Sequence, residues 1–418
     1  MSNLNIFLPT THATIYRTTL ISVTIHDIEN HFQHRVKARL LQQLSLSERL
    51  FKLASLVLTI RETLRYRGSI GQWSWVLHRA TGLGVVFFLV LHVIDTSWAV
   101  FFPALYEKAI AAYQSPLFTI GEFGLIFAVV YHAFNGLRIS IMDNKPELWK
   151  HQEKAAYGVL AATAVLLVPV FLYVIVDVVD HYGKPNVFVL PLLEVLVEQL
   201  PFAAGIGAAV VLAVILSGIY QAVSGAPATK GSAKTQGSKL ERFWWNFMRV
   251  SGVLIIPLVF GHLAMMHLLQ GVFDLTLAGS PVIGVASQGQ PLDATALAAT
   301  NLMWGDELQN GYNDTGTATE FVAERWNYLM GGVAIWKLYD IALLALVAVH
   351  GFNGLRYVLT DYTQDYPLIR RAAGYLCVMG AVVLLVVGGA ALLGTIQPTA
   401  IQMADEALRA LKEAHIAG

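Results

Sequence analysis

The sequence predicts an all-α integral membrane protein with seven transmembrane helices. Of its 418 residues 56% are apolar and 13% charged, whereas about 25% of an average soluble protein is charged. Seven stretches of about 20 mainly apolar residues match the thickness of the hydrocarbon core of a bilayer. An internal repeat further predicts two parallel three-helix units, joined by a linker transmembrane helix.

The predicted spans follow one another with short connections, except for one long loop near the end. They lie at about 75–101, 117–139, 155–178, 201–223, 244–270, 336–358 and 371–394. The first 70 residues are polar and basic, so we expect no cleaved signal peptide. This arm either docks a partner or lies as an amphipathic helix on the lipid surface. The tail at 396–418 is typical of a short amphipathic helix.

Composition excludes several function classes. Lysine plus arginine and aspartate plus glutamate both total 28, so no global positive field is present to hold nucleic acid. The single cysteine, Cys377, excludes a disulfide framework, a structural zinc site and an iron–sulfur cluster ligated by this chain alone. The glycine-rich phosphate-binding motifs of nucleotide sites are also missing from the sequence.

The distribution of basic residues predicts the orientation of the chain. Clusters follow the second, fourth and sixth spans: Arg138, Lys145, Lys150 and Lys154; Lys230, Lys234, Lys239 and Arg242; Arg356, Arg370 and Arg371. The N-terminal arm is basic as well, whereas the opposite loops carry little beyond Lys108, Lys184 and Arg325. Because loops rich in lysine and arginine stay inside, we expect a cytoplasmic N-terminus, an outside C-terminus and a location in the inner (cytoplasmic) membrane.

Two segments repeat closely. Residues 131–143 read YHAFNGLRISIMD, and residues 349–361 read VHGFNGLRYVLTD. A weaker match relates Arg79, Gly82 and His92 to Arg249, Gly252 and His262, at an offset of 170 instead of 218. About 48 extra residues therefore lie in the second copy, in an outer loop at 271–334.

The repeat defines the predicted organisation. It comprises an N-terminal arm (1–70), a first repeat (71–182), a linker with the additional span (183–240), a second repeat (241–395) and an outer tail (396–418). Three crossings leave the chain on the wrong side for a parallel second copy, and the linker span corrects this. Inverted-repeat transporters need no such spacer.

Four intramembrane histidines occur as two matched pairs. His92 and His262 each lie thirteen residues, about 20 Å, beyond the arginine of their repeat. His132 and His350 each lie six residues, about 9 Å, from the arginine at the end of their span. Two levels of paired imidazoles are typical of two bis-histidine b-type haems. Taken singly, each histidine is better explained by a hydrogen bond between helices, but repetition at matched depth reverses that preference and favours ligation for the four together.

Other polar residues near these levels have candidate roles. His78 and the arginines Arg79 and Arg249 are placed to meet haem propionates at the cytoplasmic surface, although His78 is equally explained as a solvated interfacial residue. His267 has no counterpart in the other repeat and is set aside. Histidines fourteen apart on each of two helices, the pattern of quinol-oxidising cytochrome b, occur on the first span only.

The motifs WVLHRATG, YHAFNGLRISIMD and VHGFNGLRYVLTDYT resemble those of the cytochrome b membrane-anchor subunits of succinate:quinone oxidoreductase, respiratory complex II. The first two are similar to patterns of the larger anchor, and the third to one of the smaller. The resemblance covers about 65–180 and 240–395, so the chain looks like two anchors fused into one.

The resemblance implies ligands and a quinone site. His132 and His350 would ligate the haem nearer the cytoplasm, and His92 and His262 the second haem of diheme members. Asp361, Tyr362 and Arg79 would lie by the quinone; a bilayer-interface aromatic is the alternative for Tyr362, and a helix-end charge near Arg356 for Asp361. Trp75 replaces the family's quinone-site serine, with Ser74 adjacent.

We therefore expect a diheme anchor that passes electrons to membrane quinone. The electrons would come from a flavoprotein subunit and an iron–sulfur subunit docked on the cytoplasmic face, because this chain lacks the residues to hold their cofactors. Two alternatives stay open: a haem b anchor for another respiratory dehydrogenase or a fumarate reductase, and a transporter whose histidines relay protons.

Overall fold

The computed structural model describes residues 68–185, 187–224, 239–285 and 311–416. The chain divides into two compact units, 1–68 and 69–418, and the fold below is that of the second. The predicted N-terminal arm lies almost wholly outside the described residues, as do parts of the linker and of the outer loop.

The elements in chain order are α2 (Ile70–Phe101), α3 (Pro103–Tyr113), α4 (Pro116–Asn144), η1 (Pro146–His151), α5 (Gln152–Gly183), α6 (Leu192–Glu198), α7 (Leu200–Ser224), α8 (Lys239–Ala264), η2 (Met265–Leu269), η3 (Asp274–Thr276), β1 (Ser280–Pro281), β2 (Tyr312–Asn313), α10 (Ala318–Asn327), α11 (Ile335–Tyr362), α12 (Pro367–Leu393) and α13 (Pro398–Ile416).

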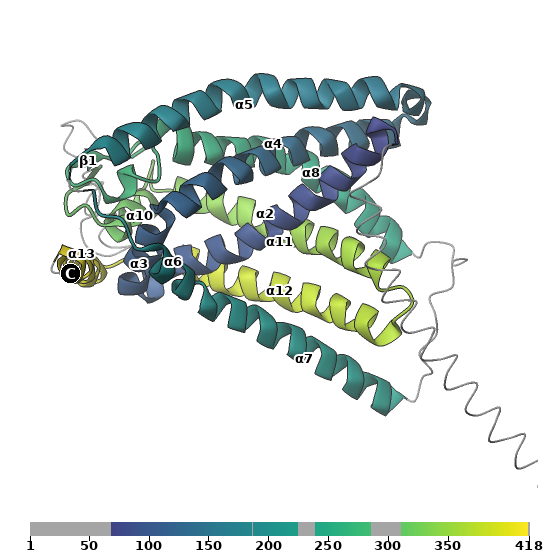
Figure 1. The fold of residues 1–418 in the computed structure, drawn as a ribbon. Coiled ribbons are helices and arrows are strands. Elements are labelled where there is room, and N and C mark those ends of the chain that lie inside the picture. The colour runs from purple at the N-terminus through teal and green to yellow at the C-terminus, as the bar shows by residue number, and fades with distance from the viewer. Residues whose placement is uncertain (1–67, 186, 225–238, 286–310, 417–418) are drawn as a thin grey trace, which may run out of the picture. The chain divides into compact units, whose positions relative to one another are not determined.

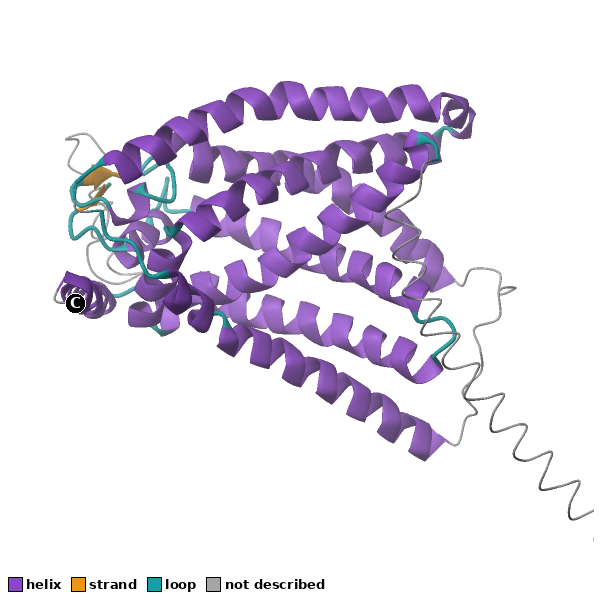
Figure 2. Cartoon of the chain, viewed as in Figure 1, coloured by secondary structure: helices purple, strands orange, loops and turns teal. Residues whose placement is uncertain are grey.

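The prediction of an all-α membrane protein with seven spans is confirmed. Figure 2 shows that nearly all of the described chain is helical, with one two-stranded antiparallel sheet, β1 and β2. The helices long and apolar enough to cross a bilayer are Ile70–Phe101, Pro116–Asn144, Pro146–Gly183, Leu192–Ser224, Lys239–Leu269, Ile335–Tyr362 and Pro367–Leu393. Most are longer than predicted, because hydropathy marks only the part of a helix inside the hydrocarbon.

Prolines mark where several helices begin. Pro103, Pro116 and Pro367 occupy the first turn of α3, α4 and α12, where a missing N–H costs no intrahelical hydrogen bond. Pro169 and Pro257 instead lie inside α5 and α8. Membrane helices tolerate such prolines because neighbouring groups satisfy the freed backbone.

The spans run side by side, with α5 and α7 at opposite edges of the bundle in Figure 1. Helix α2 packs against α4, α11 and α12, α11 also packs against α8, and the linker helix α7 packs chiefly against α12. We call the end where α2 begins, α4 ends and α5 begins the basic end. We call the opposite end, where α3, α10 and α13 gather, the cap end.

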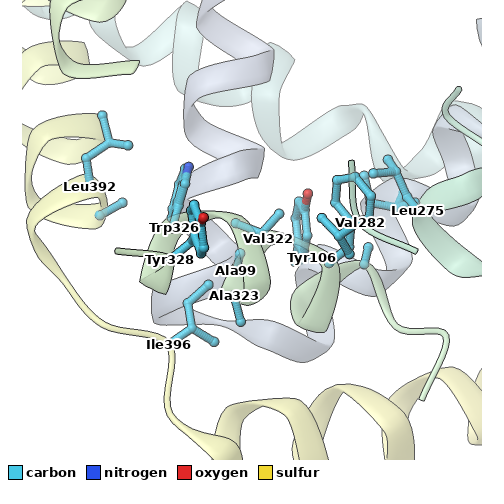
Figure 3. Close-up of a cluster of buried hydrophobic side chains, with 14 of the residues drawn as sticks. Ala99, Tyr106, Leu275, Val282, Val322, Ala323, Trp326, Tyr328, Leu392 and Ile396 are labelled. Carbon is cyan, nitrogen blue, oxygen red and sulfur yellow. The ribbon is translucent and has the colours of Figure 1, made fainter. Parts of the chain in front are cut away.

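The largest cluster of buried apolar side chains lies at the cap end (Figure 3). It joins α3 and α10 to the end of α2 and to the segment after α12, through residues such as Ala99, Tyr106, Trp326 and Ile396. Lipid is itself apolar, so membrane spans need not bury their side chains against one another. The cap is therefore where the hydrophobic effect can build a conventional core.

A buried carboxyl group connects α3 to α10. Glu107 is 1% exposed and accepts hydrogen bonds from the backbone N–H groups of Ala318 (3.0 Å) and Thr319 (2.8 Å) and from the Thr319 hydroxyl (2.7 Å). These N–H groups lie in the first turn of α10 and have no intrahelical partner. Burial raises the pKa of Glu107 above its ordinary value of 4.5.

Candidate functional site

The histidine pair nearer the cap end is formed between α2 and α8. The rings of His92 and His262 have centroids 6.0 Å apart, with planes inclined by 77°. Phe88 stacks on His92 at 5.2 Å, and Nδ1 of His262 lies 3.8 Å from Oδ1 of Asp340 on α11. The two histidines that the sequence assigned to one depth are thus direct neighbours.

The pair nearer the basic end involves α4 and α11. Nδ1 of His132 lies 3.1 Å from the carbonyl oxygen of His78, and Nδ1 of His350 lies 2.9 Å from the hydroxyl of Ser251. His132 and His350 also interact electrostatically with each other. Each ring therefore presents Nδ1 to an oxygen of the protein, and its Nε2 has no hydrogen bond within the described residues.

His78 lies closer to this pair than the sequence indicated. Its ring stacks on that of His132, with centroids 4.0 Å apart and planes inclined by 8°. Its own Nδ1 is buried and has no hydrogen-bond partner in the described part of the chain. His78 also interacts electrostatically with His350 and Arg79.

Two glycines on equivalent helices face these rings. A Cβ atom added at Gly82 would lie 2.8 Å from Cε1 of His132, and one added at Gly252 would lie 3.3 Å from Cε1 of His350. Gly82 and Gly252 correspond to each other in the repeat, as do the two histidines. In each repeat, this glycine on the first helix therefore leaves room for the histidine on the second helix of the same repeat.

Two ion pairs cross between the repeats at the basic end. Arg79 of the first repeat pairs with Asp361 of the second, and Arg249 of the second pairs with Asp143 of the first. Each guanidinium also lies over the tryptophan four residues before it, at 3.9 Å from the Trp75 ring centroid and 3.6 Å from that of Trp245. The same residue types thus make the same contacts twice, which is the arrangement expected of parallel repeats.

The predicted quinone residues are brought together only in part. Arg79 contacts both Asp361 and Trp75, and Tyr362, next to Asp361 at the end of α11, is 48% exposed. Ser74 is 3% exposed and donates to Oδ1 of Asn135 at 2.8 Å. Its hydroxyl is thus committed to packing α2 against α4.

Several polar residues near the histidines escaped the sequence prediction. Asp143 could have been predicted from the sequence, because it ends the repeated motif at the position equivalent to Asp361. His267, which was set aside, lies in the π-helical turn η2, pairs with Glu122 at 2.6 Å and interacts electrostatically with His92. No sequence signal marks Asp340, because its partner His262 lies 78 residues earlier.

Comparison with known proteins agrees with this arrangement of motifs. Residues 59–171 match the model of the succinate dehydrogenase/fumarate reductase transmembrane subunit family. The succinate dehydrogenase 2 membrane subunit SdhC of Mycobacterium tuberculosis is 34% identical over 117 residues, which cover 28% of this chain and 86% of that protein. The chain belongs to the family of membrane-anchor subunits of complex II.

A second relative is similar to this anchor to nearly the same degree. The succinate dehydrogenase hydrophobic membrane anchor subunit of Halobacterium salinarum is 32% identical over 108 residues, 25% of this chain and 82% of that protein. No solved structure matches the anchor. The family model covers the first repeat, with Arg79, His92, His132 and Asp143, and the crossed ion pairs relate the second repeat to it.

Proposed function

We propose that this anchor holds two b-type haems and passes electrons from soluble flavin and iron–sulfur subunits to membrane quinone. His92 and His262 would hold one haem, and His132 and His350 the other. The observation that carries the proposal is the grouping of the four histidines into two levels, contributed by equivalent helices of the two repeats.

The separation of His92 and His262 fits a single iron atom between them. Metal–nitrogen bonds are about 2 Å long, so two imidazoles that would hold one iron atom have ring centres about 6 Å apart. The observed distance is 6.0 Å. Asp340, whose Oδ1 lies 3.8 Å from Nδ1 of His262, would favour Nε2 of that ring as the metal ligand, since carboxylates often lie beside metal-bound histidines.

The environment of His132 and His350 also fits ligation through Nε2. Both Nδ1 atoms face an oxygen of the protein, which is the usual arrangement of a metal-binding imidazole. The buried, unpartnered Nδ1 of His78 is a polar group that a haem carboxylate would satisfy. Arg79 and Arg249 supply positive charge for the haem carboxylates at the same end. Bound haem supplies one-electron transfer between donor and quinone.

A quinone would bind beside the pair formed by Arg79 and Asp361. A partly exposed carboxylate held by a guanidinium and an exposed tyrosine hydroxyl next to it in sequence, that of Tyr362, form a set that can bind a quinone oxygen and deliver a proton to it. Trp75 forms an apolar surface beneath Arg79. We leave Ser74 out of this site, because its hydroxyl is already bonded to Asn135.

The electron donors would dock at the basic end, on the cytoplasmic face of the inner membrane. One cysteine in the whole chain cannot ligate an iron–sulfur cluster, so a flavoprotein subunit and an iron–sulfur subunit must supply those cofactors. The basic residues of this end support a cytoplasmic location for it, with the N-terminus inside and the C-terminus outside. We further propose that the chain arose by fusion of two three-helix anchors.

A matched pair of variants tests the quinone site. Asp361→Asn and Asp143→Asn break equivalent ion pairs, but only the first removes a proposed quinone residue. In the purified complex, Asp361→Asn should raise the KM for quinone about tenfold, as expected for the loss of a hydrogen bond to a charged group, and Asp143→Asn should raise it far less. Equal effects would contradict this quinone site, and a complex without succinate-oxidising subunits would contradict the proposed function.

A further inference from the structure

A groove between α4 and α5 at the basic end is not used by the proposed function. It has a volume of about 450 Å³ and is lined almost entirely by apolar side chains, among them Leu137, Ile141 and Ala162. Two polar side chains, Arg138 and His151, also line it. An apolar wall with basic side chains beside it is typical of a site that binds an amphipathic ligand.

The groove lies on the opposite face of α4 from the proposed haem ligand. Leu137 and Ile141 follow His132 by five and nine residues, which places them about 140° and 180° around the helix from it. Both are exposed, at 36% and 47%, whereas His132 faces α2. In a bundle that crosses the bilayer, this surface faces the lipid.

Arg138 has no acidic partner among the described residues. Its Nε is buried without a hydrogen-bond partner, and Nη1 reaches only the carbonyl oxygen of Gln152, at 3.4 Å. Its counterpart in the second repeat, Arg356, bonds Asn353 at 3.0 Å and pairs with Glu241 at 3.5 Å. The first repeat therefore carries a guanidinium that is available to an external anion.

The surrounding chain adds further positive charge. Lys145 and Lys150 lie in the segment that joins α4 to α5, with the acidic Glu147, and Lys154 lies at the start of α5, with the acidic Glu153. Basic pockets between transmembrane helices on the cytoplasmic side favour anionic lipid headgroups. A phosphate has the charge and the acceptor oxygens that a guanidinium binds, and acyl chains match the apolar wall.

We infer that the groove between α4 and α5 binds a phospholipid with an anionic headgroup, whose phosphate contacts Arg138 and His151 and whose acyl chains lie along Leu137, Ile141 and Ala162. The apolar wall of this site lies on the opposite face of α4 from His132, and Arg138, which also interacts electrostatically with His78, stands between the groove and the proposed haem site. The site would fasten the first repeat to the inner leaflet at the end where partner subunits dock.

Two exposed helical glycines provide a matched test. Gly158 lines the groove, whereas Gly124, on α4, does not, and a Cβ added to either meets nothing within 4 Å. The Cβ atom of Gly158→Leu therefore enters open space and its side chain should occupy the groove, whereas Gly124→Leu should add the same bulk elsewhere. Arg138→Gln removes the charge, and Lys184→Gln, at the other end of α5, is its charge control.

The measurement is native mass spectrometry of the complex, purified in neutral detergent and incubated with equal amounts of phosphatidylglycerol and phosphatidylcholine. Wild type, Gly124→Leu and Lys184→Gln should retain phosphatidylglycerol in preference to phosphatidylcholine. Gly158→Leu and Arg138→Gln should each reduce the retained phosphatidylglycerol about fivefold or more, the contribution expected of one basic residue near an anionic lipid.

Three results would overturn the inference. One is equal retention of the two lipids by wild type, and another is equal phosphatidylglycerol in Gly158→Leu and Gly124→Leu. The third is a loss of bound quinone or of haem, instead of phospholipid, in the groove variants, since either would assign the groove to the redox site.

Discussion

Gly82 and Gly252 occupy equivalent places in the two repeats, and each faces the histidine of the neighbouring helix. The space is tighter at Gly82, where an added Cβ would lie 2.8 Å from His132, than at Gly252, where it would lie 3.3 Å from His350. Gly84, two residues after Gly82 on the same helix, has nothing within 4 Å of its Cβ position. The three glycines therefore form a graded series.

We predict that Gly82→Ala displaces the His132 ring and lowers the haem content of the complex. Gly252→Ala should have a smaller effect, because a shift of a few tenths of an ångström relieves its contact. Gly84→Ala should keep the haem and stabilise the helix by up to about 1 kcal/mol. Haem absorbance per chain and thermal unfolding of the three variants measure this order. Equal haem content in Gly82→Ala and Gly84→Ala would contradict a close contact between residue 82 and the ligand His132.

At the scale of single residues, the sequence repeat predicted which residues are equivalent, but not which of them contact each other in the structure. Arg79, Asp361, Arg249 and Asp143 all belong to repeated motifs, yet their crossed pairing depends on how four helices pack. The stacking of His78 on His132 could not be predicted from the sequence either, because His78 has no counterpart in the second repeat. Equal sequence offsets between the repeats indicate which residues are related by symmetry, whereas predicting their contacts requires knowing how the helices of the bundle pack.

Helix α10 illustrates what the sequence could not predict at the scale of elements. It lies in the loop between the fifth and sixth predicted spans, and its first turn is held by Glu107, more than 200 residues earlier. Hydropathy identifies membrane helices because the bilayer imposes a length on them. No such rule marks a short helix that is fixed by a distant carboxyl group.

We predict that the stability of the cap depends on pH through Glu107. Burial raises its pKa in the folded chain, so the folded state binds this proton more tightly than the unfolded state. The free energy of unfolding of the cap should therefore fall as the pH rises from 4.5, the ordinary value, through the raised one, by up to about 1.4 kcal/mol per pH unit.

Hydrogen exchange at the amides of Ala318 and Thr319, corrected for intrinsic rates, measures this dependence between about pH 5 and 8. Wild type should lose protection as the pH rises, and Glu107→Gln, which cannot titrate, should give a flat profile. Glu107→Ala should lower protection at every pH by about 1–3 kcal/mol, because the donors lose their acceptor. Protection that increases with pH in the wild type would contradict the assignment.

The whole molecule combines two parallel repeats with one additional helix. The parity of the crossings was enough to predict that α7 must return the chain across the membrane, but not that it would pack against α12. There, Ser217 donates to the carbonyl oxygen of Leu368 at 2.8 Å. The repeats contact each other where α2 packs against α11 and α12 and where α4 packs against α8, and the crossed ion pairs connect them at the basic end. This assembly places four histidines on the inside of one chain.

The two histidine levels imply that one chain carries two haems, one at each level. A pyridine haemochrome assay with a redox titration, normalised to this chain in the purified complex, tests it most directly when repeated on His92→Ala and His132→Ala. We expect two b haems per chain, with each variant losing a different one. A single haem that is lost only with His132→Ala, or no haem at all, would contradict it.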